Sequence, residues 1–224
     1  MDMKLSGKKI IKKIFGSKAQ RKKRIKIILA LVALLSAVLY GCSTIPPSNI
    51  DNVCEIFEEK DDWYDATKDA YEKWGVPIHV QMAIIHQESK FKSQAKPPRT
   101  KVLWVIPWKR KSTAYGYAQV LDQTWDWYRK STGNSGADRD DFEDAVDFIG
   151  WYVNISHKKL GISKWDAQKQ YLAYHEGHGG YRKRTYNKKK WLISVAAKVG
   201  RRSKKYATQL KKCQSDLNSG WWWF

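Results

Sequence analysis

One carboxylate in this chain stands where acid catalysis would need it. Glu88 follows an apolar run that includes Val80, Met82 and residues 83–85, and Ser89 comes directly after it. A segment that is apolar nearly all round predicts a buried helix. A carboxylic acid at the end of such a helix would lie where the core meets a cleft, and burial there would raise its pKa so that it could donate a proton near neutral pH. The ordinary alternative is a solvated glutamate at a helix end.

Two later motifs carry side chains that could orient a polar substrate. The first is Ala114-Tyr-Gly-Tyr-Ala-Gln119, and the second is Ala173-Tyr-His-Glu-Gly-His-Gly179. An amide and a phenol can each donate and accept hydrogen bonds. The ordinary alternatives are that Gln119 caps a helix and that Tyr174 belongs to the core.

The three motifs in this order resemble the soluble lytic transglycosylase domain and its relative, goose-type lysozyme. Those families combine a glutamate-serine pair at the end of a buried helix with a Gly-x-x-Gln motif and an Ala-Tyr-Asn-x-Gly motif. The resemblance covers roughly residues 55–215, and it departs from the family pattern where His175 replaces the asparagine and Ala118 replaces a methionine. It implies a catalytic role for Glu88 and substrate binding by Ser89, Tyr117, Gln119, Tyr174 and Glu176.

The chemistry that the resemblance implies is cleavage of the β-1,4 bond between N-acetylmuramic acid and N-acetylglucosamine in peptidoglycan. A lytic transglycosylase would use Glu88 first as acid and then as base, while the substrate's own C6 hydroxyl attacks and forms a 1,6-anhydro end. That reaction needs no cofactor, no metal and no second carboxylate.

Two alternatives belong to the same resemblance. A lysozyme-type hydrolase would need a second carboxylate, for which Glu176 is the candidate. Glu176 could instead raise the pKa of Glu88 through its like charge, or hold backbone amides of a loop. The other alternative is a non-catalytic protein that binds the cell wall.

Other functional classes fit less well. The two histidines of His175-Glu-Gly-His178 are three residues apart, whereas the zinc-peptidase motif places them four apart on one helix face. The chain contains 42 Lys and Arg against 22 Asp and Glu, for a formal net charge of +20, and such a surface attracts polyanions of any kind. Nucleic acid is not an expected partner because the N-terminus predicts export. Peptidoglycan glycan strands and the membrane remain, and the sequence does not indicate a protein partner.

Residues 1–41 predict a lipoprotein-type signal peptide. Its basic region is long, and its apolar core at residues 27–40 is too short for a comfortable membrane span. Leu39-Tyr-Gly-Cys42 resembles the bacterial lipobox, which implies lipid attachment at Cys42. Because Ser43 follows, the resemblance implies the periplasmic face of the outer membrane. An uncleaved signal anchor is the alternative.

The other two cysteines of the chain are Cys54 and Cys213, near opposite ends of the exported part. Export permits a disulfide, and two remaining cysteines favour one between them. Free buried thiols are the alternative.

The exported part is predicted to be mainly α-helical, with a lysozyme-like fold. Residues 42–52 resemble a tether, residues 53–217 the domain, and residues 218–224 an aromatic tail whose role the sequence does not indicate. A small β-hairpin or extended loop is expected near residues 97–111, where Trp104 and Trp108 either stack on sugar or fix the loop to the domain. The helical patterns cover residues 53–74, 77–88, 113–133, 138–155, 163–174 and 191–217.

Overall fold

A computed structural model describes residues 22–29, 45–102, 106–110 and 112–219, with side chains throughout except at residues 100–110. The chain divides into two compact units, residues 1–45 and 46–224. Within the first unit, residues 22–29 form a helix. Cys42, most of the apolar core before it, Trp104 and the tail at 220–224 lie outside the described residues. None of the described helices is long and apolar enough to span a membrane.

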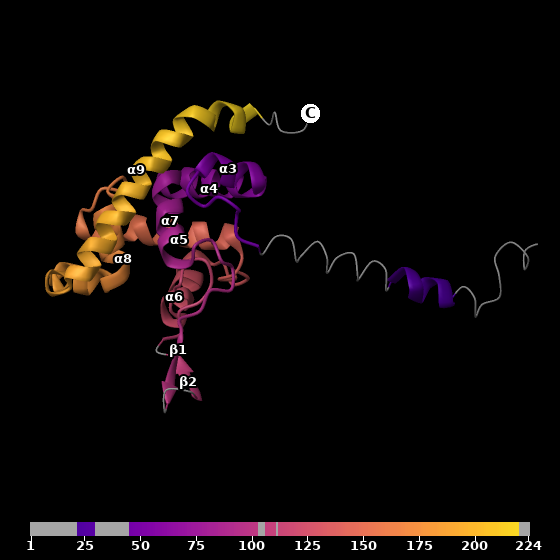
Figure 1. The fold of residues 1–224 in the computed structure, drawn as a ribbon, viewed down its shortest axis with the longest axis horizontal. Coiled ribbons are helices and arrows are strands. Elements are labelled where there is room, and N and C mark those ends of the chain that lie inside the picture. Colours follow the sequence, from indigo (N-terminus) through magenta and orange to yellow (C-terminus); the bar gives the residue numbers. More distant parts are fainter. Residues whose placement is uncertain (1–21, 30–44, 103–105, 111, 220–224) are drawn as a thin grey trace, which may run out of the picture. The chain divides into compact units, whose positions relative to one another are not determined.

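The second unit is mainly helical, as predicted, and carries one two-stranded sheet (Figure 1). Its helices and strands are α3 (Val53–Glu59), α4 (Asp61–Trp74), α5 (Ile78–Ser89), β1 (Arg99–Val102), β2 (Ile106–Arg110), α6 (Asp122–Thr132), α7 (Phe142–Leu160), α8 (Ala167–Arg182), the short 3-10 helix η1 (Thr185–Lys188) and α9 (Lys190–Ser219).

Helix α5 forms the centre of this unit. It contacts α4, α7, α8 and α9, and Val80, Met82, Ile84 and Ile85 are fully buried (Figure 1). The one fully buried polar side chain on it, Gln81, donates from Nε2 to the backbone oxygens of Thr67 and Val76, at 3.1 Å and 2.8 Å. Burial on all sides is what the apolar run predicted. The end of α5 is therefore held rigidly by its neighbours.

Several helix boundaries differ from the prediction. The single helix expected over residues 53–74 is two, because Lys60 leaves the helical region with φ −133° and ψ 76° between α3 and α4. The helix expected from residue 163 begins later, at Ala167, and Asp166 caps it by accepting a hydrogen bond from the Lys169 amide. Residues 113–121 form a turn, not the start of a helix, so that α6 begins at Asp122.

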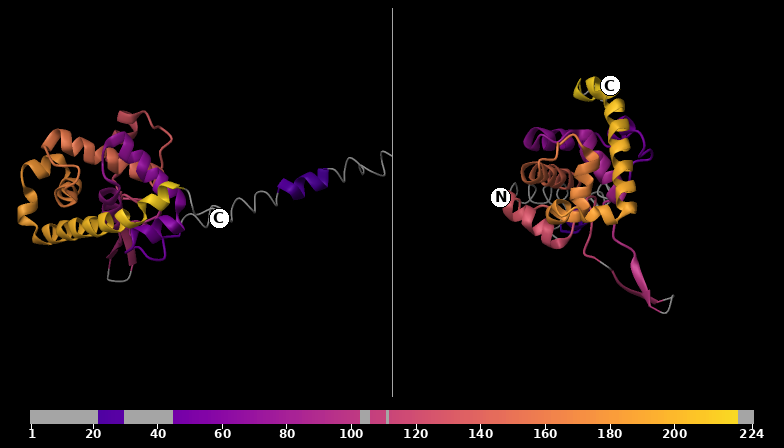
Figure 2. Two further views of the ribbon diagram at one scale, coloured as in Figure 1. Left: turned by 90° about the horizontal axis from the view of Figure 1, so that it is seen from above. Right: turned by 90° about the vertical axis from the view of Figure 1, so that its left-hand side faces the viewer.

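The predicted hairpin is present. Strands β1 and β2 pair antiparallel, with Arg99 opposite Arg110 and Val102 opposite Ile106. They extend away from the helices of their unit, as both views in Figure 2 show. The hairpin forms within the segment of the chain that connects Glu88 to Gln119.

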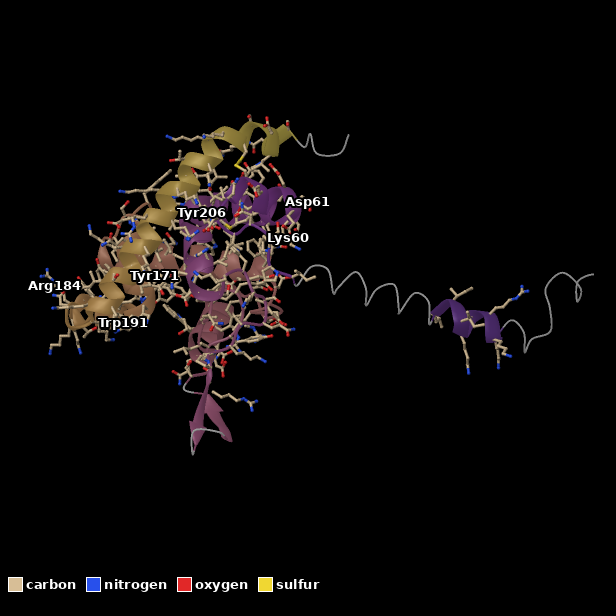
Figure 3. All side chains as sticks on the ribbon, in the orientation of Figure 1. Lys60, Asp61, Tyr171, Arg184, Trp191 and Tyr206 are labelled. Carbon is tan, nitrogen blue, oxygen red and sulfur yellow. A yellow bond between two sulfur atoms is a disulfide. The ribbon has the colours of Figure 1, made fainter. Side chains whose placement is uncertain are left out.

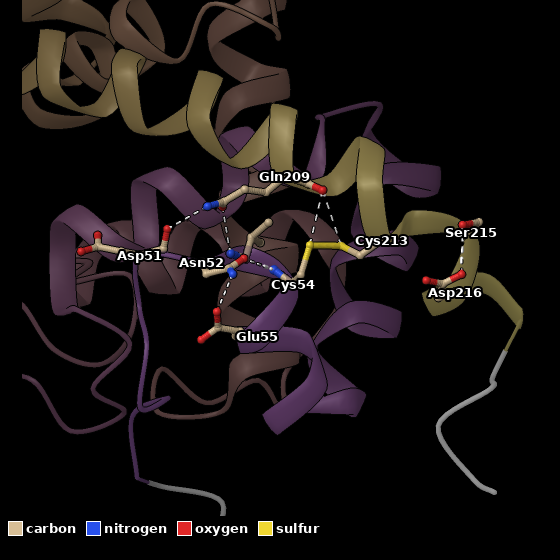
Figure 4. Close-up of a disulfide and its surroundings, with 9 residues drawn as sticks. Asp51, Asn52, Cys54, Glu55, Gln209, Cys213, Ser215 and Asp216 are labelled. Atoms are coloured by element: carbon tan, nitrogen blue, oxygen red, sulfur yellow. Dashed lines mark hydrogen bonds between the residues drawn. A yellow bond between two sulfur atoms is a disulfide. The ribbon is translucent and has the colours of Figure 1, made fainter.

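The disulfide expected between Cys54 and Cys213 is formed, with Cα atoms 6.1 Å apart, and it joins α3 to α9 (Figure 4). Gln209 reinforces the junction, because its Nε2 donates to the Asp51 carbonyl and its Oε1 accepts from the Val53 amide, both at 3.1 Å. The last residues of the expected tether are thus bound to the domain.

Candidate active site

A cavity of about 460 Å³ opens beside the end of α5. Glu88 lines it from α5, the 114–121 turn and α6 line a second side, and α7 and α8 line the rest. The lining residues are Glu88, Ala114, Gln119, Val120, Leu121, Thr124, Phe148, Tyr152, Tyr174, His175, Glu176 and Gly177. Three of the sequence motifs therefore meet at one cavity, although they are far apart in the chain.

Glu88 is the carboxyl of this cavity whose pKa is raised. Burial raises its pKa from the ordinary value of 4.5 to about 7, and a hydrogen bond from the Tyr171 hydroxyl opposes that rise. Figure 3 shows Tyr171 among the side chains of the helical body. The raised pKa therefore comes from loss of water, not from a second carboxylate. A carboxyl with this pKa is about half protonated near neutral pH, and it can donate a proton and take one back.

The chain turns sharply directly after Glu88. Lys90 and Phe91 both adopt left-handed backbone conformations, with φ of 55° and 60°, and Phe91 is fully buried. Residues other than glycine rarely adopt this conformation, and it costs roughly 1 kcal/mol or more at each position. The turn ends α5 at Ser89 and places the Glu88 side chain at the cavity.

Gln119 lies in a tight turn that Gly116 makes possible. Gly116 has φ 79°, and a Cβ atom there would lie 1.9 Å from the carbonyl oxygen of Arg139. The Gln119 Nε2 donates to the carbonyl oxygens of Ala95 and Gly116, at 2.7 Å and 2.9 Å. The side chain thus fixes the segment after α5 to the turn while it lines the cavity.

Tyr174 is on α8 and closes the cavity against this turn. Its hydroxyl donates to the Ala118 carbonyl oxygen at 2.6 Å. Burial raises its pKa well above the ordinary value, so the phenol stays protonated. Three residues later Gly177 interrupts the helix with φ 70° and ψ 164°, a conformation that is essentially confined to glycine. The break turns the backbone after Tyr174 along the cavity wall.

Glu176 is a carboxylate with its oxygens already engaged. Oε1 accepts from Lys189 Nζ at 2.7 Å and lies 3.2 Å from His175 Nδ1, and Oε2 accepts from the Thr185 hydroxyl. Burial opposes its ionisation, but these three hydrogen bonds outweigh burial and lower its pKa to about 2. Glu176 is therefore permanently ionised and links α8 to η1 and the start of α9.

The structure brings together four of the six residues that the resemblance singled out: Glu88, Gln119, Tyr174 and Glu176. It does not bring Ser89 or Tyr117 to the cavity. The Ser89 hydroxyl donates to the Ile85 carbonyl oxygen of its own helix at 3.3 Å. Tyr117 is 2% exposed and packs edge-on against Trp63 and Phe142. We assign packing roles to both.

Three residues at the site were not anticipated. Tyr171 hydrogen-bonds Glu88, and Phe148 and Tyr152 line the cavity from α7. Helical spacing is a signal that could have found them, because Tyr171 is three residues before Tyr174 and Phe148 is four before Tyr152, so that each pair shares a helix face.

The histidines near the cavity do not form a metal centre. His178 Nε2 lies 2.9 Å from the Ser156 hydroxyl and its ring stacks on Tyr152, while His175 contacts Glu176 and packs edge-on against Trp191. Among the described residues, no group of three or more histidine, cysteine or acidic side chains is placed to hold a metal ion.

A helical body around a buried central helix, with a glutamate at the end of that helix facing a cavity, is the arrangement of a lysozyme-like domain. The family model described as the transglycosylase SLT domain matches residues 30–213, which is most of the chain. The chain therefore belongs to this transglycosylase family. A comparison with curated proteins found no match.

Proposed function

We propose that this protein is a peptidoglycan lytic transglycosylase in which Glu88 is the single acid and base. The observation that carries the proposal is the pKa of Glu88, which burial raises to about 7 at a cavity that the three family motifs share. A general acid works best when its pKa lies near the working pH, because both of its protonation states are then accessible.

The reaction divides into two proton transfers through the same carboxyl. Protonated Glu88 gives its proton to the oxygen that links N-acetylmuramic acid to N-acetylglucosamine, and the bond from C1 to that oxygen breaks. The Glu88 carboxylate then takes the proton from the C6 hydroxyl of the same N-acetylmuramic acid. The C6 oxygen bonds to C1, the 1,6-anhydro ring closes, and Glu88 is protonated again. No water is consumed.

Gln119 and Tyr174 would orient the sugar for this reaction. The Gln119 amide nitrogen donates to two backbone carbonyls, so its oxygen is the group left to accept from the substrate's acetamido N–H. The Tyr174 hydroxyl donates to Ala118, which leaves its oxygen as an acceptor. Both side chains are held before substrate binds, and such preorganisation lowers the cost of orienting the reacting groups.

We further propose that the domain works in the cell envelope as a lipoprotein. Residues 1–41 would be the signal, Cys42 would carry the lipid, and the domain of residues 53–217 would act on glycan strands from the periplasmic face of the outer membrane. The disulfide between Cys54 and Cys213 supports an oxidising compartment. Mass spectrometry of the mature N-terminus tests this, with a diacylated Cys42 as the expected result and an intact N-terminus as the contrary one.

A lysozyme-type hydrolase is the second candidate, because Glu176 places an ionised carboxylate at the same cavity. Its oxygens are committed to Lys189, Thr185 and His175, which favours a structural role. We therefore expect Glu176→Gln to keep a turnover within about tenfold of wild type, since loss of a catalytic carboxylate costs far more than that. A turnover as low as that of Glu88→Gln would instead make Glu176 the second catalytic group.

The activity itself is tested by digesting purified peptidoglycan with the full-length protein and its Glu88→Gln variant. We expect wild type to release soluble muropeptides. We expect the Glu88→Gln variant to release them at least about a hundredfold more slowly, because a positioned general acid usually contributes that much to the rate. Glu72→Gln is the matched control, because it makes the same chemical change at an exposed glutamate on α4. Retained activity in Glu88→Gln would exclude the mechanism.

A further inference from the structure

A second hollow, of about 310 Å³, lies between α5 and α9 and is unusually basic. Nine residues line it, and five of them are Lys or Arg while none is acidic. Ala83, His86 and Gln87 come from α5, Lys90 directly follows its end, and α9 contributes Lys198, Val199, Arg201, Arg202 and Lys205. We call these nine residues the basic pocket.

The basic pocket lies on a different side of α5 from the active site. Residues 83, 86 and 87 are at helical spacing and therefore share one face of α5. Glu88 points about 140° around the helix axis from Ala83, at 3.6 residues per turn. The pocket is thus separate from the sugar-cleaving cavity, and no step of the proposed reaction uses its residues.

The charges of the basic pocket are poorly balanced by the protein itself. Asp51 pairs with Arg202, and Arg202 is the one cation of the five that forms a salt bridge within the described part of the chain. Five cations less this one carboxylate leave a net charge of four. Burial lowers the pKa of Lys90, and the neighbouring charge of Arg202 lowers it further. Like charges gathered in a hollow oppose folding, and such groupings are typical of sites that bind an oppositely charged ligand.

His86 contributes a hydrogen-bond donor without adding charge. Its Nδ1 accepts from Lys90 Nζ at 3.1 Å, so the ring proton is on Nε2, which faces Asp51 Oδ1 at 3.9 Å. Burial, followed by the charge of Lys90, lowers the pKa of His86 to about 3, and the ring is therefore neutral at physiological pH. The His86 ring thus holds the Lys90 ammonium group in place beside the pocket.

We propose that the basic pocket binds a phosphate group, carried either by a soluble phosphate compound or by a phospholipid headgroup. A phosphate monoester carries close to two negative charges and three strong acceptor oxygens. The phosphodiester of a phospholipid headgroup carries one negative charge and two free oxygens, so a net charge of four suits either source. Within one guanidinium group, such as that of Arg201 or Arg202, two N–H donors are spaced to match two oxygens of a phosphate, whereas a lysine acts as a point charge. The volume exceeds that of one phosphate, so part of the esterified group can enter with it.

Calorimetry with inorganic phosphate tests the proposal on the full-length protein, held in a neutral detergent at low salt because screening weakens such binding. The pocket variant is Lys198→Gln with Lys205→Gln. Its matched control is Lys204→Gln with Lys212→Gln, which removes the same two charges from exposed positions of the same helix outside the pocket. Equal melting temperatures of the three proteins establish that each is folded.

We expect the pocket variant to bind phosphate on the order of tenfold or more weakly than wild type, and the control to stay within about twofold, because a hydrogen bond to a charged group is typically worth a tenfold change. No phosphate binding by wild type, or an equal loss in both variants, would overturn the proposal. Competition with a short-chain phosphatidylglycerol below its micelle concentration identifies the source. If the lipid binds more tightly than inorganic phosphate and displaces it, the natural ligand is a headgroup. If the lipid binds more weakly, the natural ligand is a soluble phosphate compound. Both results support the site.

Discussion

The hydrogen bond from Tyr171 to Glu88 gives a prediction with both a sign and a size. This bond favours the charged carboxylate and therefore holds the pKa of Glu88 below the value that burial alone would set. Tyr171→Phe removes the hydroxyl and keeps the ring. A hydrogen bond to a charged group contributes about 1.5–3 kcal/mol, and about 1.4 kcal/mol corresponds to one pH unit. The variant should therefore raise the pKa of Glu88 by about one to two units, from about 7 to between about 8 and 9.

The assay is the rate of muropeptide release at low substrate concentration as a function of pH. The first step needs Glu88 protonated, so activity is present below its pKa and is lost as pH rises through it. Raising the pKa therefore moves the alkaline limb of the profile upward by about one to two pH units. Tyr152→Phe is the control, because that tyrosine lines the same cavity but its hydroxyl donates to the Ala173 carbonyl oxygen at 3.4 Å.

An active Tyr171→Phe variant whose alkaline limb coincides with that of wild type would refute this reasoning. So would a limb that moves downward, because the hydrogen bond would then favour the protonated form. A limb that moves equally in Tyr152→Phe would show that the cavity as a whole, and not the bond to Glu88, sets the pKa.

Three further changes have outcomes that the structure specifies. Glu88→Gln should stabilise the fold by up to about 3 kcal/mol above pH 7 and by little below pH 4. The reason is that the pKa of Glu88 is higher in the folded state, so the stability of wild type falls as pH rises from 4.5 to 7. Denaturant titration at both pH values checks this, and equal effects at the two would count against a buried carboxyl. Gly116→Ala should cost about 3 kcal/mol or more, since its Cβ would meet the Arg139 carbonyl at 1.9 Å, and a melting temperature near that of wild type would contradict the clash. Reduction of the Cys54–Cys213 disulfide, which closes a separation of 159 residues, should cost about 4–5 kcal/mol in the chain-entropy model; unchanged denaturant stability in reductant would argue against it.

Local patterns were sufficient to predict α5 and the position of Glu88. The apolar run before Glu88 specifies burial on every side. Gly75, which adopts the left-handed conformation easily because it has no Cβ, ends α4 just before that run. A glutamate that follows such a run must emerge at an edge of the core. The mainly helical fold and the hairpin near residues 97–111 could be predicted for similar local reasons.

The rest of the site depends on contacts between distant segments, which no local pattern reveals. Gln119 holds its turn by donating to Ala95, which is 24 residues earlier. A helical pattern was expected over residues 113–133, but the left-handed conformations of Gly116 and Gln119 make the first part of that segment a turn. Glu176 looked like a possible second catalytic carboxylate because its partner Lys189 is 13 residues away in the chain.

The most direct test of a single-carboxyl transglycosylase is the chemistry of the new glycan ends. Peptidoglycan is digested by the full-length protein in water labelled with heavy oxygen, and the ends are identified by mass spectrometry. We predict 1,6-anhydro ends without the label, and their loss in Glu88→Gln. Reducing ends that carry the label would show that water attacks and would contradict the central claim.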